Sequence, residues 1–116
     1  GFSTYFLVVW DYIKYARDNN LDYWTGKPNS SYGSLVEKSR GIYPNKAGRI
    51  ENHHITPKYL GGAKNGPTVP LNGSYHQMIT NEFRSLWPYG YPNPSAQQLQ
   101  LIMKEVYGKF PLPPGY

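Results

Sequence analysis

The segment from residue 49 to residue 86 most constrains the fold, because its pattern changes from strand to loop to strand to helix within a short span. Residues 49–55 have strand character, and Pro57 ends this strand since proline cannot donate to a sheet ladder. Turn-forming glycines and asparagines follow, and residues 68–71 make a second strand candidate. A helix is then predicted to about Leu86. The segment therefore predicts a small hairpin followed directly by a helix.

Three capping-box patterns place the starts of helices along the chain, and the first, Ser34 with Glu37, predicts a short helix. Ser74 and Gln77 fit this pattern at the start of the central helix, and Ser95 begins a second helix over residues 95–107. Apolar residues at spacings of three and four predict a further amphipathic helix over residues 3–18. The fold class expected is α+β, with flanking helices around the central segment. The tail after these helices is expected to be extended and to lie on the surface.

Length and composition limit the organisation further. A chain of 116 residues is expected to form one domain, residues 1–116. It contains no cysteine, which excludes disulfides and thiolate metal sites. No apolar run is long enough to span a membrane, so no membrane span is predicted. The chain begins at Gly1 without an initiator methionine, which we interpret as a domain taken from a longer protein.

All three histidines, His53, His54 and His76, lie within 24 residues. Histidine is the commonest metal ligand and suits proton transfer near neutral pH. Neighbouring strand residues point to opposite faces, but at a bent strand end both can serve one site. One would then bind a metal and the other would face the reacting group, while His76 approaches the same metal from its helix. The alternative is an exposed histidine pair and a helix-capping His76.

This set of groups suits phosphodiester hydrolysis. A divalent metal with few protein ligands keeps coordination positions open, and a histidine can act as general base. Residues 27–64 carry seven basic side chains against two acidic ones, an excess equal to the whole net charge of +5. Such an excess favours a polyanionic partner such as nucleic acid, although it is also compatible with a solvated surface. The scattered acidic residues do not indicate a two-metal carboxylate nuclease.

The motif Glu51-Asn52-His53-His54-Ile55-Thr56-Pro57 resembles the HNH/endonuclease VII superfamily, together with the Gly61-Gly62 turn, Val69-Pro70-Leu71 and His76. The resemblance covers about residues 49–90 and implies a ββα-metal (His-Me finger) core. The Glu-x-His-His opening is similar to the Glu-His-His-His type of nuclease domain found at the C-termini of bacterial polymorphic toxins. The resemblance therefore implies a metal-dependent endonuclease that hydrolyses DNA.

Roles follow from the resemblance position by position. His53 matches the first metal ligand, His54 the general base, and His76 the metal ligand on the helix. Glu51 would orient a histidine or add a ligand; its alternative is a surface salt bridge with Arg49.

Basic residues near the motif are candidates for phosphate contacts. We choose Arg84 and Lys58 because each lies close to a motif histidine in sequence. Each is equally explained as a solvated surface charge.

Two features depart from the family pattern. The central Asn of the family falls near Pro67 or Thr68, and Asn65 and Asn72 are out of register. The residue one turn after His76 is Thr80, a poor ligand for a transition metal. An open, oxygen-rich site suits Mg²⁺ or Mn²⁺, whereas histidine nitrogens favour Zn²⁺ or Ni²⁺. The sequence does not choose between these two pairs of metals.

The setting implied by the resemblance is a secreted or injected bacterial toxin that acts in the cytoplasm of a target cell. We expect an acidic immunity protein to neutralise it by covering the basic face. The alternatives are an RNase of the same fold and a non-catalytic nucleic-acid-binding module with structural zinc. A zinc protease is excluded by the absence of a His-Glu-x-x-His helix.

Overall fold

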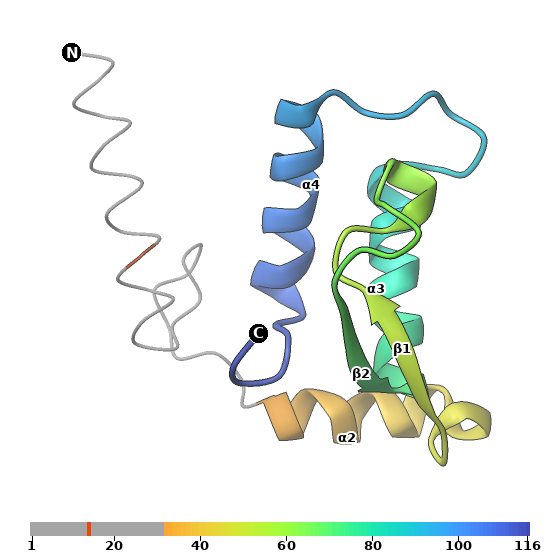
Figure 1. Ribbon diagram of the computed structural model, residues 1–116. Helices are drawn as coiled ribbons and strands as arrows, with labels where there is room; N and C mark the ends of the chain where they lie inside the picture. Colours follow the sequence, from red (N-terminus) through yellow and green to blue (C-terminus); the bar gives the residue numbers. More distant parts are fainter. Residues whose placement is uncertain (1–13, 15–31) are drawn as a thin grey trace. The chain divides into compact units, whose positions relative to one another are not determined.

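The structure is a computed structural model that describes Lys14 and residues 32–116, and the latter form one compact unit. The predicted helix over residues 3–18 lies outside the described residues, apart from Lys14, which is helical and exposed. Within residues 32–116 the fold is α+β, as predicted (Figure 1). The order of elements is α2 (Tyr32–Ile42), β1 (Ile50–His54), β2 (Thr68–Asn72), α3 (Gly73–Leu86) and α4 (Ala96–Lys109).

The two strands form an antiparallel hairpin that leads directly into α3. His53 pairs with Val69 and His54 with Thr68. Burial alternates along the strands, so that His53 is buried and His54 is partly exposed. This alternation is the period of two expected for a sheet with one covered face. Both predicted strands are confirmed to within one residue at each end.

The start of α3 differs from the prediction. The side chain of Asn72 is the cap and accepts a hydrogen bond from the backbone N–H of Ser74 at 3.0 Å. The hydroxyl of Ser74 instead donates to the carbonyl oxygen of Tyr43, and the side-chain oxygen of Gln77 accepts from Lys46 Nζ. The predicted Ser74–Gln77 capping box is therefore wrong, because residues from the segment before β1 compete for both side chains.

The hydrophobic core lies where α3 faces the hairpin, α2 and α4. Figure 1 shows α3 and α4 side by side, with α2 crossing one end of α3. Burying each large apolar side chain contributes roughly 1.5–3 kcal/mol. The fully buried apolar side chains are Leu60, Val69, Leu71, Tyr75, Ile79, Phe83 and Val106. Among the described residues, no helix is long and apolar enough to cross a membrane.

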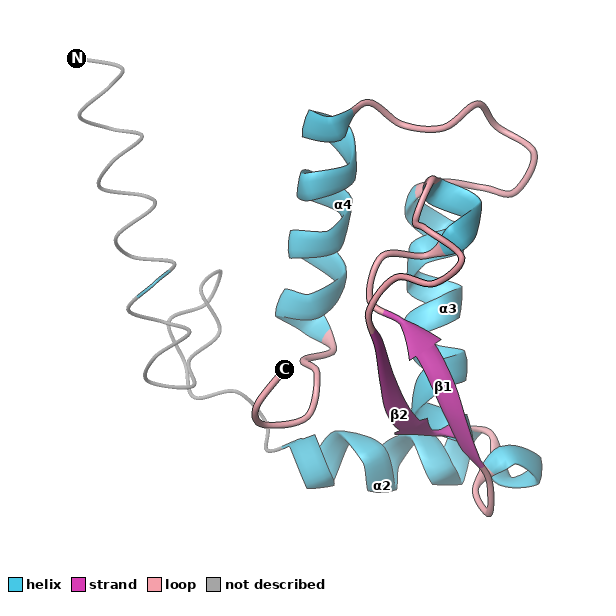
Figure 2. Cartoon of the chain, in the orientation of Figure 1, coloured by secondary structure: helices cyan, strands magenta, loops and turns pink. Residues whose placement is uncertain are grey.

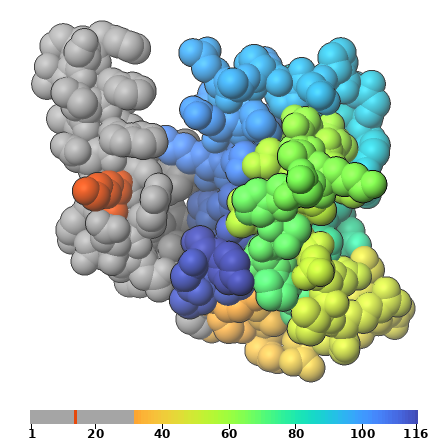
Figure 3. Space-filling model, in the orientation of Figure 1, coloured from red at the N-terminus to blue at the C-terminus, as the bar shows by residue number. Residues whose placement is uncertain are grey.

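Helix α4 begins as predicted, but the tail that follows it differs from the prediction. Ser95 Oγ accepts from the backbone N–H of Gln98, and the Gln98 side chain accepts from the backbone N–H of Ser95, which confirms the capping box. The helix ends at Lys109, two residues beyond the prediction. The tail then packs on the core: Phe110 is buried, and the carbonyl oxygen of Pro111 accepts from Tyr75 Oη at 2.6 Å. Figure 3 shows the tail, in dark blue, bordering α2 and the strands.

The Gly61–Gly62 turn shapes the loop between the strands (Figure 2). Gly61 has a φ of +103°, a conformation that residues with a Cβ rarely adopt. A Cβ on Gly62 would lie 2.1 Å from the carbonyl oxygen of Thr56, so only glycine fits. The backbone N–H of Gly62 donates to the carbonyl oxygen of Pro57 at 3.0 Å. These two glycines turn the chain back toward the end of β1, where the histidine pair lies.

Candidate active site

The three histidines surround one cavity of about 320 Å³. His53 and His54 come from the end of β1, and His76 comes from the first turn of α3. Two basic residues also line the cavity, Lys58 from the turn after β1 and Arg84 from the last turn of α3. The structure therefore brings five of the six predicted site residues to one cavity. The sixth, Glu51, contacts the cavity-lining His76.

His53 is the buried histidine of the site, with 4% of its surface exposed. The hydroxyl of Tyr107 donates its hydrogen to the carbonyl oxygen of Ile55, so its oxygen accepts from His53 Nε2 at 2.7 Å. This arrangement assigns the ring hydrogen to Nε2 and leaves the lone pair on Nδ1. Burial, with smaller contributions from His76 and His54, lowers the pKa of His53 to about 4. The ring is therefore neutral at pH 7, the state that binds a metal.

His54 is held by a backbone group. Its Nε2 lies 2.9 Å from the carbonyl oxygen of Lys64, in the loop that the two glycines turn back. A carbonyl only accepts, so the neutral ring carries its hydrogen on Nε2 and its lone pair on Nδ1. Asn72 is committed to capping α3 and donating to Ala47. The carbonyl of Lys64, and not a side-chain amide, therefore holds the His54 ring.

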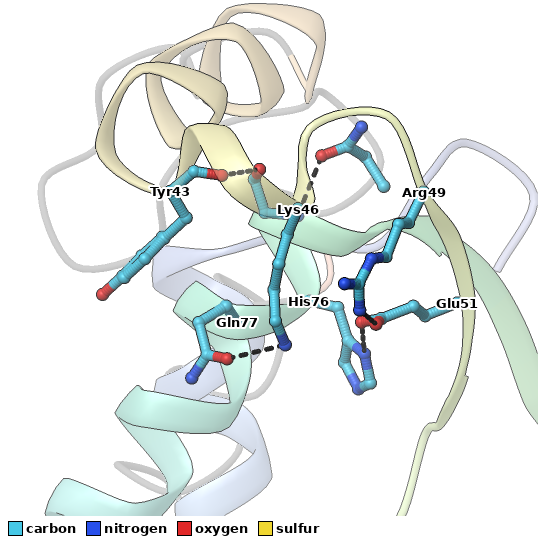
Figure 4. Close-up of polar contacts among 8 residues, drawn as sticks. Tyr43, Lys46, Arg49, Glu51, His76 and Gln77 are labelled. Carbon is cyan, nitrogen blue, oxygen red and sulfur yellow. Dashed lines mark hydrogen bonds and ion pairs between the residues drawn. The ribbon is translucent and has the colours of Figure 1, made fainter.

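Glu51 supports His76 (Figure 4). Its Oε1 lies 2.9 Å from His76 Nδ1, so Nδ1 donates and the lone pair of the neutral ring falls on Nε2. This hydrogen bond, with the positive charges of Lys46 and Arg49, lowers the pKa of the Glu51 carboxyl against the opposing effect of burial. Arg49 also pairs with Glu51, but at 3.9 Å and with an exposed side chain, which makes that pair weak. Both interpretations of Glu51 therefore hold, and the contact with His76 is the stronger one.

The spacing between the rings of His53 and His76 is compatible with a shared metal ion. With about 2.1 Å from each nitrogen to the ion and a tetrahedral angle, two imidazole rings have centres about 5 Å apart. The ring centres of His53 and His76 are 5.0 Å apart. Within the part of the chain that the structure describes, no group of three or more histidine, aspartate or glutamate side chains could hold a metal. A metal held by His53 and His76 would have two protein ligands, fewer than the four of a closed structural zinc site.

Another part of the cavity lining is aromatic and basic. The rings of Tyr59 and Tyr89 stack with centres 4.8 Å apart and planes 6° apart. The guanidinium carbon of Arg84 lies 4.7 Å from the centre of the Tyr89 ring, which is a cation–π contact. Lys58 lies next to Tyr59 in the same short turn and is exposed. Positive charge therefore lies beside the histidines.

Sequence reasoning did not identify Tyr107, Tyr59 or Tyr89 as parts of the site. Tyr107 follows Val106, a residue on the predicted buried stripe of α4, and its hydroxyl was the one available signal that a polar group would be buried there. The tyrosines of the stack lie 30 residues apart in sequence, and no local pattern joins them. Thr80, one turn after His76, lines the cavity.

Comparisons with known proteins do not assign a family. No family model matches the chain, and no solved structure matches it. A stretch of 36 residues is 50% identical to DNA polymerase III subunit alpha of Borreliella burgdorferi, which corresponds to 31% of this chain and 3% of that protein. The similarity therefore spans a small fraction of the polymerase subunit.

Proposed function

We propose that this protein is a metal-dependent endonuclease with a ββα-metal core that hydrolyses phosphodiester bonds of DNA. The observation that carries the proposal is that three histidines from two elements line one cavity, each with a hydrogen-bond partner that leaves a ring nitrogen available. Each contact assigns one ring nitrogen as a donor. The other nitrogen of each ring is then free to bind a metal or to accept a proton.

His53 and His76 are the proposed metal ligands, through Nδ1 and Nε2 respectively. Tyr107 holds His53, and Glu51 holds His76, as carboxylates commonly hold metal-binding histidines. A bound divalent ion would stabilise the negative charge that develops on the phosphate and on the leaving oxygen. Mg²⁺ and Mn²⁺ suit the open positions, while Zn²⁺ and Ni²⁺ suit the two nitrogens.

His54 is the proposed general base. The carbonyl of Lys64 accepts the hydrogen of Nε2, which leaves Nδ1 to take a proton from water. The water oxygen then forms a bond to phosphorus, and the bond between phosphorus and the leaving oxygen breaks. Lys58 and Arg84, which line the same cavity, are the proposed contacts to phosphate oxygens.

The proposed setting is a toxin domain of a larger secreted bacterial protein, and it depends on the sequence resemblance. A cell that makes such a nuclease needs a partner that neutralises it. The excess of basic residues over residues 27–64 favours an acidic immunity protein that covers the face around the histidines. A native complex in which this face is left uncovered would contradict that mechanism.

The first test uses supercoiled plasmid, incubated with the purified protein and with Mg²⁺, Mn²⁺, Zn²⁺ or EDTA. Wild-type protein should nick the plasmid in at least one metal and not in EDTA. The His54→Gln variant keeps a side-chain donor toward the carbonyl of Lys64 but has no basic nitrogen. Its cleavage rate should fall by roughly 10²- to 10⁴-fold, the usual contribution of general base catalysis.

The matched control separates the effect of losing the general base His54 from the effect of changing a charge near it. Lys64→Ala removes a nearby positive charge but keeps the backbone carbonyl that holds His54. We expect this variant to retain most of its activity. If His54→Gln is folded and as active as wild type, His54 is not the base. If wild type cuts RNA but no plasmid, the substrate assignment changes to RNA; if it cuts neither in any metal, the nuclease proposal is wrong.

A further inference from the structure

The stacked tyrosine pair and Arg84 together form an aromatic and basic part of the cavity lining. Tyr59 and Tyr89 lie face to face, 4.8 Å apart, and Arg84 contacts the Tyr89 ring. Tyr89 is 63% exposed, so its ring contributes little to the core. A large aromatic ring that is exposed beside a guanidinium group presents both stacking and positive charge to a ligand.

This stack is held rigidly. Tyr59 Oη donates to the carbonyl oxygen of Trp87 at 2.9 Å, which ties the turn after β1 to the end of α3. The next residue, Leu60, is 1% exposed and anchors the turn in the core. Arg84 extends from the last turn of α3. A ligand that stacks here therefore meets rings that are already ordered, and binding requires little loss of conformational freedom.

The stack lies in the same cavity as the histidines. The cavity volume of about 320 Å³ is at the lower end of small-molecule sites, roughly 300–1,000 Å³. Bases inside a duplex are stacked on their neighbours and cannot present a face to a protein ring. A stacking surface inside this small cavity is therefore accessible to an unpaired base and not to a base that is stacked within a duplex.

We propose that Tyr59, Tyr89 and Arg84 form a stacking site for an unpaired nucleobase next to the phosphate that is cleaved. The proposal rests on the proposed nuclease function and narrows its substrate to nucleic acid that is single-stranded at this position. Stacking on aromatic rings is tolerant of base identity, because every base has a π face. The site therefore selects for strandedness rather than for sequence.

The test measures binding without cleavage. Full-length His54→Gln protein in EDTA is titrated into fluorescent oligonucleotides, and their anisotropy is followed. Three ligands of equal phosphate number are compared: oligothymidylate, a fully abasic oligomer and a DNA duplex. In a separate titration, oligouridylate replaces oligothymidylate to compare RNA with DNA. The thymidylate oligomer should bind roughly 5- to 100-fold more tightly than the abasic one, the range for stacking of one base.

Variants on the same background assign the difference to the stack. Tyr89→Ala should abolish the preference for bases and leave affinity for the abasic oligomer unchanged, while Tyr89→Phe should keep it. Tyr91→Ala is the matched control, because Tyr91 is 62% exposed and its ring packs against Trp87 at 6.4 Å. It should keep the preference.

Four outcomes would overturn the stacking site. The first two are equal affinity for the abasic and thymidylate oligomers, and an equal loss of affinity for both in Tyr89→Ala. The other two are binding of the duplex as tightly as the single strand, and an absence of binding to every ligand. Equal affinity for the abasic and thymidylate oligomers, together with plasmid nicking by the wild-type protein, refutes only the stacking site. A base-dependent affinity in a protein whose wild type never cleaves refutes only the nuclease.

Discussion

Replacing Tyr107 with phenylalanine tests the hydrogen bond that sets the state of His53. The substitution removes one hydroxyl, which both accepts from His53 Nε2 and donates to the carbonyl of Ile55. His53 is 4% exposed, so water does not readily replace the lost partner. A buried donor left without a partner costs about 1–3 kcal/mol, and the lost bond to Ile55 adds about 0.5–1.5 kcal/mol. We expect the free energy of unfolding to fall by about 1.5–4.5 kcal/mol.

Urea unfolding at pH 7 without metal measures this change, and Tyr43→Phe is the control. The hydroxyl of Tyr43 accepts an exposed hydrogen bond from Asn81, so its loss should cost no more than about 0.5 kcal/mol. The melting temperature of Tyr107→Phe should fall by roughly 5 °C or more. Isothermal titration with Zn²⁺ adds a second readout, in which we expect an affinity about 10- to 100-fold weaker. Equal stability of the two variants would refute the argument that Tyr107 satisfies a buried group.

Three further predictions follow from the same contacts. The pKa of His53 is about 4 in the fold against 6.5 in a free side chain, so between these pH values the unfolded chain binds more protons than the folded one. The free energy of unfolding should therefore fall by up to about 3 kcal/mol as the pH drops from 6.5 to 4. A free energy of unfolding in urea that stays constant over that range would contradict this prediction. Glu51→Gln removes the negative charge that contacts His76 and should lower the affinity for metal, measured by calorimetry, about 10- to 100-fold. An unchanged affinity would show that the Glu51 charge does not support metal binding by His76. Gly62→Ala puts a Cβ 2.1 Å from the carbonyl of Thr56 and should lower stability by about 2 kcal/mol or more in urea, whereas Gly48→Ala, with open space around it, should not.

Local patterns predicted most elements of the described part of the chain. The two strands, α3 and α4 lie within two residues of their expected bounds, because each has its own periodicity and a nearby stop signal. The Ser95 capping box was predictable since both of its hydrogen bonds form within four residues. The capping box at Ser74 failed for the opposite reason: Tyr43, 31 residues away, supplies a better partner for its hydroxyl. The sequence predicts a surface segment for the tail, because the contact that holds it on the core joins Pro111 to Tyr75, 36 residues away.

The order of residues alone placed three histidines, a glutamate and two basic residues in one region, since strand, turn and helix follow each other without a break. It could not decide which ring nitrogen carries the hydrogen, which other residues line the cavity, or which group holds His54. Those features depend on partners 10, 25 and 54 residues away: the carbonyl of Lys64 for His54, Glu51 for His76, and Tyr107 for His53. Hydrogen bonds over such separations require α3, α4 and the loop between the strands to be packed against β1, so tertiary structure decides them.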